Sequence, residues 1–315
     1  MHIRLILSLI LSFTIGVSLG HYKPEYFAIP ISYIKNFLID DEKNIYKESI
    51  LRLEKDFLRG SCGSEEEGYS FFVAGHVYGT PGELYKGIYQ PFKTNNILNS
   101  CLFMPLGFLL GDAVVEASEI EFEILKKEID SFRKDTKIHI SPGNHEVGSG
   151  KYNAKRDVYM NNFGDTYKYF KYRDDLFIVL DGNENNWNIA DDQLEMLRNL
   201  ASGEENYNNV FIFSHQVIWN DPQKKEFLGL IPNSNEGKAE KLTFWSDVFP
   251  LIKDLGSKVY IFAGDVGAFD NRSEFFYNNF SGVSFFATGM GGGKRDNFLL
   301  IHVKKDRVNI DLIEL

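Results

Sequence analysis

The chain has 315 residues, 43% of them hydrophobic and 25% charged, which is enough for a large core and excludes global disorder. The formal net charge is −10, and an acidic chain repels phosphate backbones at long range, which disfavours generic nucleic-acid binding. A small anionic substrate remains compatible with this charge if a bound metal supplies local positive charge.

The first residues of the chain are predicted to be a secretory signal. Arg4 precedes an apolar run over residues 5–19, and Ser18 and Gly20 are small residues at the −3 and −1 positions of a cut before His21. The run is short for a membrane span, which needs about 20 residues, and an uncleaved membrane anchor is the alternative. In either case we expect the rest of the chain to be exported, to the periplasm or the extracellular space.

A helix is predicted over residues 31–59. Apolar residues recur there at steps of four, three and four and form one stripe. The stripe consists of Tyr46, Ile50, Leu53 and Phe57. Gly60 is placed to end this helix.

The two cysteines, Cys62 and Cys101, leave two interpretations open. In an oxidising compartment they could form a disulfide, and otherwise they are two buried free thiols. Their spacing does not match a metal-binding pattern.

From residue 69 onward, short apolar runs alternate with longer amphipathic segments. The runs are YSFFVA, FLLG, KIHISPG, LFIVLDG, NVFIFSH, VYIFAGD and VSFFATG. Because they are apolar throughout, they predict strands that are buried on both faces. Ser118 and Glu121 form a capping-box pattern before one helix, IADDQLEMLRNL predicts another, and the C-terminal tail predicts a hairpin around KKDR.

These elements predict one α/β domain behind an N-terminal helical extension. The expected divisions are a signal peptide or anchor over 1–20, a helical extension and loop over 21–68, and the main domain over 69–315.

Five of the predicted strands end in a turn that carries polar residues or glycine. The turns are Gly75-His76, Gly111-Asp112, Gly143-Asn144-His145-Glu146, Ser214-His215 and Gly264-Asp265. Ligands of parallel sheets bind outside the carboxyl ends of the strands, and glycine lets the backbone approach them closely. The oxygen and nitrogen donors at these turns suit a divalent ion such as Mn, Fe, Zn or Mg.

In their order, these motifs resemble those of the calcineurin-like metallophosphoesterases, which read D-x-H, G-D, G-N-H-[DE], H and G-H-x-H. The resemblance covers residues 69–315. It implies an α/β fold of two sheets in a sandwich flanked by helices. It also implies hydrolysis of phosphate esters by a metal-activated water.

Carried over residue by residue, the resemblance assigns one metal site to four residues. They are Asp112, Asn144, His215 and Asp265. The other metal site of the family has lost two ligands, because Ala74 stands at the D-x-H aspartate and Gly267 at the last histidine. Only His76 and the shared Asp112 remain there, so we expect one ion and not two.

His145 resembles the family histidine that protonates the leaving oxygen, a role that suits a side chain whose pKa lies near working pH. The residue that would orient it is replaced by Val115, with Glu116 next in the sequence. His76 is a candidate second catalytic residue, either as a donor behind the metal or as a phosphate contact, and the alternative is a turn histidine bonded to a backbone carbonyl. Glu146 is interpreted as a turn carboxylate.

The glycine-rich segment GMGGGKRDN, residues 289–297, also has two interpretations. Its backbone N–H groups could face a bound anion, with Lys294 and Arg295 nearby, or the segment is a hairpin loop.

The resulting hypothesis is an exported metal-dependent hydrolase of phosphate esters with one retained metal site. Its partner would be a small phosphorylated substrate or a phosphorylated glycan. The alternative is a catalytically degenerate protein of the same fold that binds a phosphorylated or glycan ligand or scaffolds an envelope complex. The loss of the two ligands at Ala74 and Gly267 favours that alternative.

Overall fold

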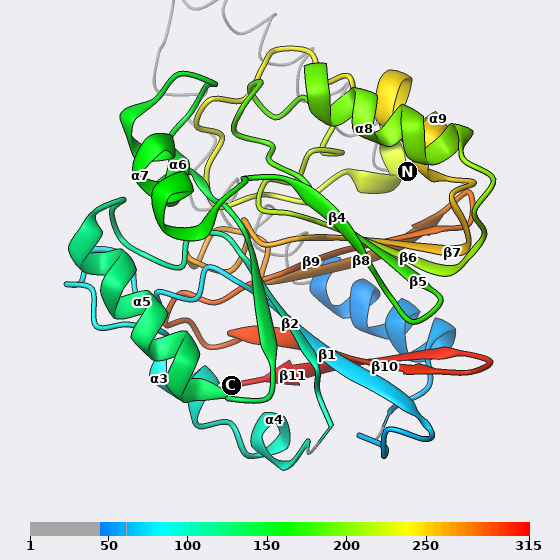
Figure 1. Ribbon diagram of the computed structural model, residues 1–315, viewed down its shortest axis with the longest axis horizontal. Helices are drawn as coiled ribbons and strands as arrows, with labels where there is room; N and C mark the ends of the chain where they lie inside the picture. Colours follow the sequence, from blue (N-terminus) through cyan, green and yellow to red (C-terminus); the bar gives the residue numbers. More distant parts are fainter. Residues whose placement is uncertain (1–44, 61, 102) are drawn as a thin grey trace, which may run out of the picture. The chain divides into compact units, whose positions relative to one another are not determined.

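The structure is a computed structural model and describes residues 45–60, 62–101 and 103–315. The stretch Ile45–Leu315 forms one compact unit, drawn in colour in Figure 1. The predicted leader and the first part of the predicted helical extension lie outside the described residues. Within the described part of the chain, no helix is long and apolar enough to cross a membrane.

Two mixed β-sheets form the centre of this unit (Figure 1). The first has five strands in the order β11-β10-β1-β2-β3, and the second has six in the order β4-β5-β6-β7-β9-β8. The strands of the first sheet span Gly68–Gly75 (β1), Leu106–Leu110 (β2), Lys137–Ser141 (β3), Asn297–Lys304 (β10) and Val308–Glu314 (β11). Those of the second span Lys168–Tyr172 (β4), Asp175–Val179 (β5), Tyr207–Ser214 (β6), Gly256–Ala263 (β7), Phe275–Phe280 (β8) and Val283–Thr288 (β9).

Within each sheet a parallel group of strands brings its carboxyl ends to one edge. In the first sheet β1, β2 and β3 are parallel, and in the second β5, β6, β7 and β9 are parallel. These seven strands are the seven apolar runs of the sequence, and β10 and β11 form the predicted C-terminal hairpin. The prediction of a two-sheet α/β fold is confirmed.

Helices flank the sheets. Besides the helix over residues 45–56, they are α3 (Gln90–Lys93), α4 (Asn96–Ser100), α5 (Glu119–Phe132), α6 (Asn144–Val147), α7 (Ala154–Phe163), α8 (Asp191–Ser202) and α9 (Phe249–Ile252). A 3₁₀ turn spans Lys225–Phe227 and a π-helical turn spans Phe244–Val248. In Figure 1, α5 lies along the first sheet, while α8 and α9 lie along the second.

Side chains of β1 show why the strand is apolar throughout. Phe71 faces the second sheet, where its ring centroid lies 6.3 Å from that of Phe213. Phe72 and Ala74 point the other way, into a cluster that they share with Phe122 of α5. Because both faces of the strand are covered, polar residues would lose hydration on either face.

The helix over residues 45–56 confirms the described part of the predicted apolar stripe. Tyr46 and Leu53 are buried in the cluster between the two sheets, with Ile50 and Phe57 packed against it. The helix ends at residue 56, four positions before Gly60. The backbone N–H of Gly60 instead donates to the Asp311 carboxylate at 3.0 Å.

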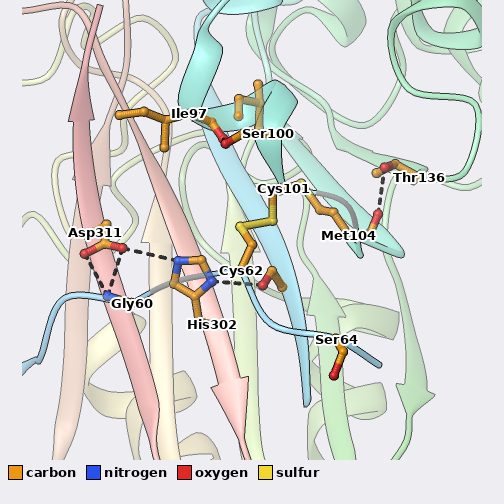
Figure 2. The surroundings of a disulfide bond; sticks show 12 residues. Gly60, Cys62, Ser64, Ile97, Ser100, Cys101, Met104, Thr136, His302 and Asp311 are labelled. Atoms are coloured by element: carbon orange, nitrogen blue, oxygen red, sulfur yellow. Dashed lines mark hydrogen bonds and ion pairs between the residues drawn. A yellow bond between two sulfur atoms is a disulfide. The ribbon is translucent and has the colours of Figure 1, made fainter. Parts of the chain in front are cut away.

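A disulfide joins Cys62 and Cys101 and resolves the two interpretations of the cysteines (Figure 2). It links the segment after the first described helix to the end of α4, across a sequence separation of 39. Next to it, His302 of β10 lies between Ser70 and Asp311, with its ring nitrogens 2.9 and 3.2 Å from their oxygens. The disulfide and the two polar contacts of His302 therefore both stabilise this part of the first sheet.

Removing the disulfide by the double substitution Cys62→Ala, Cys101→Ala is expected to lower the free energy of unfolding by about 4 kcal/mol. The reason is the conformational entropy that an unfolded chain gains when a loop of this length is opened. Urea denaturation followed by circular dichroism measures the loss. Dithiothreitol should destabilise the parent protein equally and leave the double variant unchanged; a loss below about 1 kcal/mol would contradict the entropic account.

Candidate metal centre

The two sheets touch where their strands end, because glycines allow backbone contact there. A Cβ added to Gly264, after β7, would lie 2.0 Å from the carbonyl oxygen of Leu110, the last residue of β2. A Cβ added to Gly75, at the end of β1, would lie 2.4 Å from Cα of Gly264. Such distances exclude any side chain, so glycine is required at both positions. The polar turns that follow these strands are thereby brought together.

Four predicted ligands meet at this place. The Nε2 atom of His215 lies 3.4 Å from Oδ1 of Asp112, 3.3 Å from Oδ1 of Asn144 and 4.0 Å from Oδ1 of Asp265. Asp112, His215 and Asp265 are buried, and their ligand atoms all lie within 4.8 Å of one another. Among the described residues this is the only group of three or more histidine, cysteine or carboxylate side chains with such spacing.

The orientation of His215 suits a metal ligand. Its Nδ1–H donates to the carbonyl oxygen of Leu110 at 2.8 Å, which leaves Nε2 directed at the carboxylates. A hydrogen bond from the second ring nitrogen is the usual way in which proteins fix a metal-binding imidazole. Asp265 supplies a second sign, since its Oδ1 is buried and has no hydrogen-bond partner among the described residues. An unpaired buried carboxylate oxygen is costly, and a cation would satisfy it. The residues present therefore fit a divalent ion.

The electrostatics of the cluster favour added positive charge. Burial raises the pKa of Asp265 to about 8. Burial lowers the pKa of His215, but the carboxylates of Asp112 and Asp265 outweigh it and leave that pKa above its ordinary value. For Asp112, burial raises the pKa, and the imidazoles of His215, His145 and His76 together bring it below the ordinary value. Each shift reflects buried negative charge in need of a positive partner.

Glu146 builds the turn that presents Asp112. Its carboxylate is fully buried and accepts four backbone N–H groups, at 2.7 to 3.0 Å. The donors are Asp112, Ala113, Val114 and Gly143. Asp112 has a φ of 49°, in the left-handed region that aspartate tolerates better than most residues. Glu146 therefore ties the two ligand-bearing turns together, the turn role that the sequence indicates.

His145 is oriented by a backbone group. Its Nδ1–H donates to the carbonyl oxygen of Val115 at 2.6 Å, which leaves Nε2 free to carry a proton. Glu116 is exposed and plays no part in this contact. The turn around Val115 is held by the Glu121 carboxylate, which accepts the N–H groups of Val115 and Glu116 at 2.8 and 2.9 Å. Of the predicted capping box only the Ser118 half forms, because Glu121 serves this turn instead.

His76 lies next to Oδ2 of Asp112, whereas His215 lies next to Oδ1. The Nε2 of His76 is 3.7 Å from Oδ2 of Asp112, and its Nδ1 is buried without a partner among the described residues. Burial lowers the pKa of His76 to about 4. The ring packs against Tyr78, with centroids 4.3 Å apart. The polar neighbours of His76 are the Asp112 carboxylate and the backbone of Met290, and both raise its pKa against the effect of burial. Both interpretations of this histidine therefore stay open.

Two positions to which the resemblance would assign ligands of a second metal ion, 74 and 267, carry no ligand side chain and have little room for one. Ala74 is fully buried in β1. Gly267 has a φ of 85°, and a Cβ there would lie 2.7 Å from the carbonyl oxygen of Gly289. A histidine cannot occupy position 267 without displacing that backbone.

The variant Ala74→Asp is therefore expected to leave the metal content unchanged, because one restored carboxylate still lacks the partner histidine at position 267. We expect the free energy of unfolding to fall by about 3 kcal/mol, since the new carboxylate enters an apolar cluster. Elemental analysis after dialysis measures the metal content, and urea denaturation measures the free energy of unfolding. A stoichiometry that rises by one ion per chain would show that a second ion can still bind at these positions.

The glycine-rich segment binds an anion that belongs to the chain itself. The backbone N–H groups of Gly291, Gly292 and Gly293 donate to the Asp296 carboxylate at 2.9 to 3.0 Å. The interpretation as a site for an external anion is therefore wrong for these N–H groups. The hairpin-loop interpretation is also wrong, because the segment connects β9 of the second sheet to β10 of the first. Because Asp296 lies only a few residues away, it reaches these donors without help from the rest of the fold.

Comparisons with known proteins add a likeness of fold. No protein-family model matches this sequence, and no curated protein matches it. Among solved structures, a purple acid phosphatase from yellow lupin (Lupinus luteus) seeds matches with a TM-score of 0.57 and 14% identity, over 81% of this chain and 52% of that chain. The chain thus spans about half the length of that phosphatase.

Two structures of Vps29 match less closely. A single mutant from Entamoeba histolytica has a TM-score of 0.36 and 10% identity, over 78% of this chain and 99% of that chain. The protein from Chaetomium thermophilum has a TM-score of 0.31 and 10% identity, over 78% of this chain and 95% of that chain. With the sheet order and flanking helices described above, the likeness to the phosphatase shows that this chain has the calcineurin-like metallophosphoesterase fold.

Proposed function

We propose that this protein is a metal-dependent hydrolase of phosphate esters that works with one metal site. The observation that carries the proposal is the convergence of Asp112, Asn144, His215 and Asp265 around the free Nε2 of His215. The unpaired Oδ1 of Asp265 supports it, because a buried carboxylate oxygen in a cluster of donors is suited to a cation. Manganese, iron, zinc and magnesium all accept such a set of ligands.

The chain's own residues have separate tasks in this proposal. Asp112, Asn144, His215 and Asp265 hold the ion, which when bound polarises a phosphoryl oxygen and lowers the pKa of a water molecule. His145, fixed through Nδ1 by Val115, holds a proton on Nε2 for the leaving oxygen. Glu146 keeps the turns of Asp112 and Gly143 at a constant separation. His76 borders Asp112, and its role in this proposal is to contact a phosphate oxygen.

Metal analysis together with a chromogenic phosphate ester tests the function. Elemental analysis after dialysis should find about one divalent ion per chain, and p-nitrophenyl esters of phosphate should be hydrolysed. Asn144→Ala should abolish turnover, whereas Asn199→Ala on the exposed face of α8 should not change it. A protein that binds the metal and hydrolyses neither mono- nor diesters would overturn the enzymatic function.

The variant His145→Ala is expected to keep its metal and to slow hydrolysis by about 100- to 10,000-fold, the usual contribution of a positioned general acid. The His145 side chain contacts the Val115 carbonyl and is not a ligand, so the metal content should not fall. Steady-state kinetics and elemental analysis on the same sample separate the two effects. Equal rates for the variant and the parent would remove His145 from the mechanism.

A second candidate function is binding without turnover. The lack of a ligand side chain at Ala74 and Gly267 favours it, because one ion cannot hold both the attacking and the leaving oxygen as two ions do. Such a protein would bind a phosphorylated or glycan ligand or scaffold an envelope complex. Metal-independent binding of a phosphorylated glycan with no hydrolysis would establish this function instead.

We also propose that the protein is exported, with its N-terminal segment as a signal or a membrane anchor. The disulfide between Cys62 and Cys101 supports this, because disulfides persist mainly in oxidising compartments. A small phosphorylated substrate or a phosphorylated glycan outside the cytoplasm would then be the partner. Cell fractionation with an antibody against the mature chain tests the location.

A further inference from the structure

Tyr78 packs against both His145 and His76, the histidine that the resemblance would assign to a second ion. Its ring centroid lies 4.3 Å from that of His76 and 5.3 Å from that of His145. Its backbone N–H donates to the carbonyl oxygen of Asp112 at 3.1 Å, which fixes the residue beside that ligand. The sequence analysis did not single out this residue, because a tyrosine two positions after a histidine belongs to no metal motif.

The Tyr78 hydroxyl is available to a ligand. The side chain is half-buried, and the hydroxyl makes no hydrogen bond with a described residue. The phenol keeps its proton at pH 8, because the ordinary pKa of tyrosine is about 10. The phenol ring thus packs against two imidazole rings, and its backbone is bonded to that of Asp112, so the residue carries a neutral O–H donor into the surroundings of the metal centre.

The charge of the centre differs from that of a two-metal site. Three buried carboxylates, Asp112, Glu146 and Asp265, have no ion pair with a lysine or arginine within the described residues. Burial raises the pKa of Asp265 and outweighs the charge of Arg272, which lowers it. One divalent ion therefore leaves little or no excess positive charge, whereas two ions would leave about two charges more. Coulomb energy scales with the product of the charges, so a dianion gains much less here than at a two-metal site.

We infer that Tyr78 takes the place of the second ion as a hydrogen-bond donor to a phosphoryl oxygen, and that the centre consequently selects singly charged phosphodiesters over doubly charged phosphomonoesters. The inference rests on the proposed phosphoesterase function. A phenol O–H stabilises one oxygen that carries partial charge but cannot neutralise a second full negative charge. A phosphodiester carries one negative charge, so a single hydrogen-bond donor to one of its oxygens is sufficient.

The reaction balances as an ordinary hydrolysis. The oxygen of water forms a bond to phosphorus, one P–O ester bond breaks, and the electron pair of that bond leaves with the ester oxygen. His145 supplies the proton that converts this oxygen to an alcohol, and the proton lost by the water restores it. The products are a phosphomonoester and an alcohol. Because that monoester is a dianion above its second pKa of about 6, the same charge preference favours its release.

Kinetics and binding on the metal-loaded full-length protein test the inference. At pH 8, kcat/KM for bis-p-nitrophenyl phosphate should exceed that for p-nitrophenyl phosphate by about tenfold or more. Tyr78→Phe, which keeps the ring between His76 and His145, should lower the diester value by about 100-fold, as loss of one donor to a reacting oxygen does. Its metal content should stay unchanged. Tyr152→Phe, at a side chain that is 95% exposed, is the matched control and should behave like the parent.

Calorimetry gives a second readout that does not depend on turnover. Dimethyl phosphate, a monoanion, should bind the parent protein at pH 8 more tightly than inorganic phosphate, and Tyr78→Phe should bind dimethyl phosphate about tenfold less tightly. A parent that prefers the monoester and inorganic phosphate would overturn the inference while the phosphoesterase function stands. Hydrolysis of neither ester would overturn that function, and the binding order of the two anions would still decide the charge preference.

Discussion

Replacing Asp112 with alanine is expected to reduce bound metal from about one ion per chain to less than about a tenth of that amount. Asp112 is the ligand candidate at the centre of the cluster, with its two carboxylate oxygens 3.4 Å from His215 Nε2 and 3.7 Å from His76 Nε2. Without it, only Asn144, His215 and Asp265 would remain to hold the ion. Elemental analysis after dialysis measures the metal, and hydrolysis should be lost with it.

The backbone of Asp112 requires a second variant as a control for folding. Alanine is disfavoured at its φ of 49°, whereas asparagine tolerates that region and keeps the shape of the side chain. Asp112→Asn should therefore lose the metal with a smaller loss of stability than Asp112→Ala. Glu116→Gln removes an exposed carboxylate four residues away and should retain full metal content. Unchanged metal in Asp112→Asn and Asp112→Ala would exclude this residue as a ligand.

Replacing Glu146 with glutamine is expected to lower the free energy of unfolding by about 4 kcal/mol. One carboxylate oxygen accepts the N–H groups of Asp112 and Gly143, and the other accepts those of Ala113 and Val114. The amide of glutamine turns one acceptor into a donor, so two buried N–H groups lose their partner at about 1–3 kcal/mol each. Urea denaturation followed by circular dichroism measures this loss.

A second carboxylate in the same region provides the matched control for Glu146. Glu121 also accepts two backbone N–H groups, from Val115 and Glu116, but it is half-buried and water can replace it. Glu121→Gln should cost about 1 kcal/mol or less. Because Glu146 joins the turns that carry Asp112 and Asn144, its variant should also bind metal more weakly than Glu121→Gln. Equal losses in the free energy of unfolding for the two variants would show that the buried hydrogen bonds of Glu146 stabilise the fold no more than the half-buried ones of Glu121.

Most of the strands could be predicted from the sequence, with two exceptions at the edges of the second sheet. The seven apolar runs mark strands that are covered on both faces, as Phe71 and Phe72 of β1 illustrate with their contacts to the second sheet and to a helix. The sequence analysis did not predict β4 or β8, which are the outermost strands of the second sheet. The side chains of β4 alternate between half-buried and exposed, so an apolar run does not mark it.

The glycine-rich segment and the orientation of His145 show the limit of motif reasoning within the site. The spacing of Gly291, Gly292 and Gly293 predicts N–H groups that could face an anion, but it does not say that Asp296 is that anion. Likewise, no pattern indicates that the Val115 carbonyl orients His145 in place of a carboxylate. Every residue has a backbone carbonyl, so a contact made by that group does not restrict the residue type and cannot be predicted from the sequence.

The sequence by itself determined which residues could bind metal, because strand ends marked by Gly-Asp, Gly-Asn-His and Ser-His are local patterns that chemistry restricts to few residue types. It also determined the α/β layers, since burial on two faces requires apolar runs. Only the tertiary structure decided that Cys62 pairs with Cys101, that position 267 has no room for a histidine, and that Tyr78 borders Asp112. These depend on distances between segments far apart in the chain, which are set when the two sheets close against each other at Gly75 and Gly264.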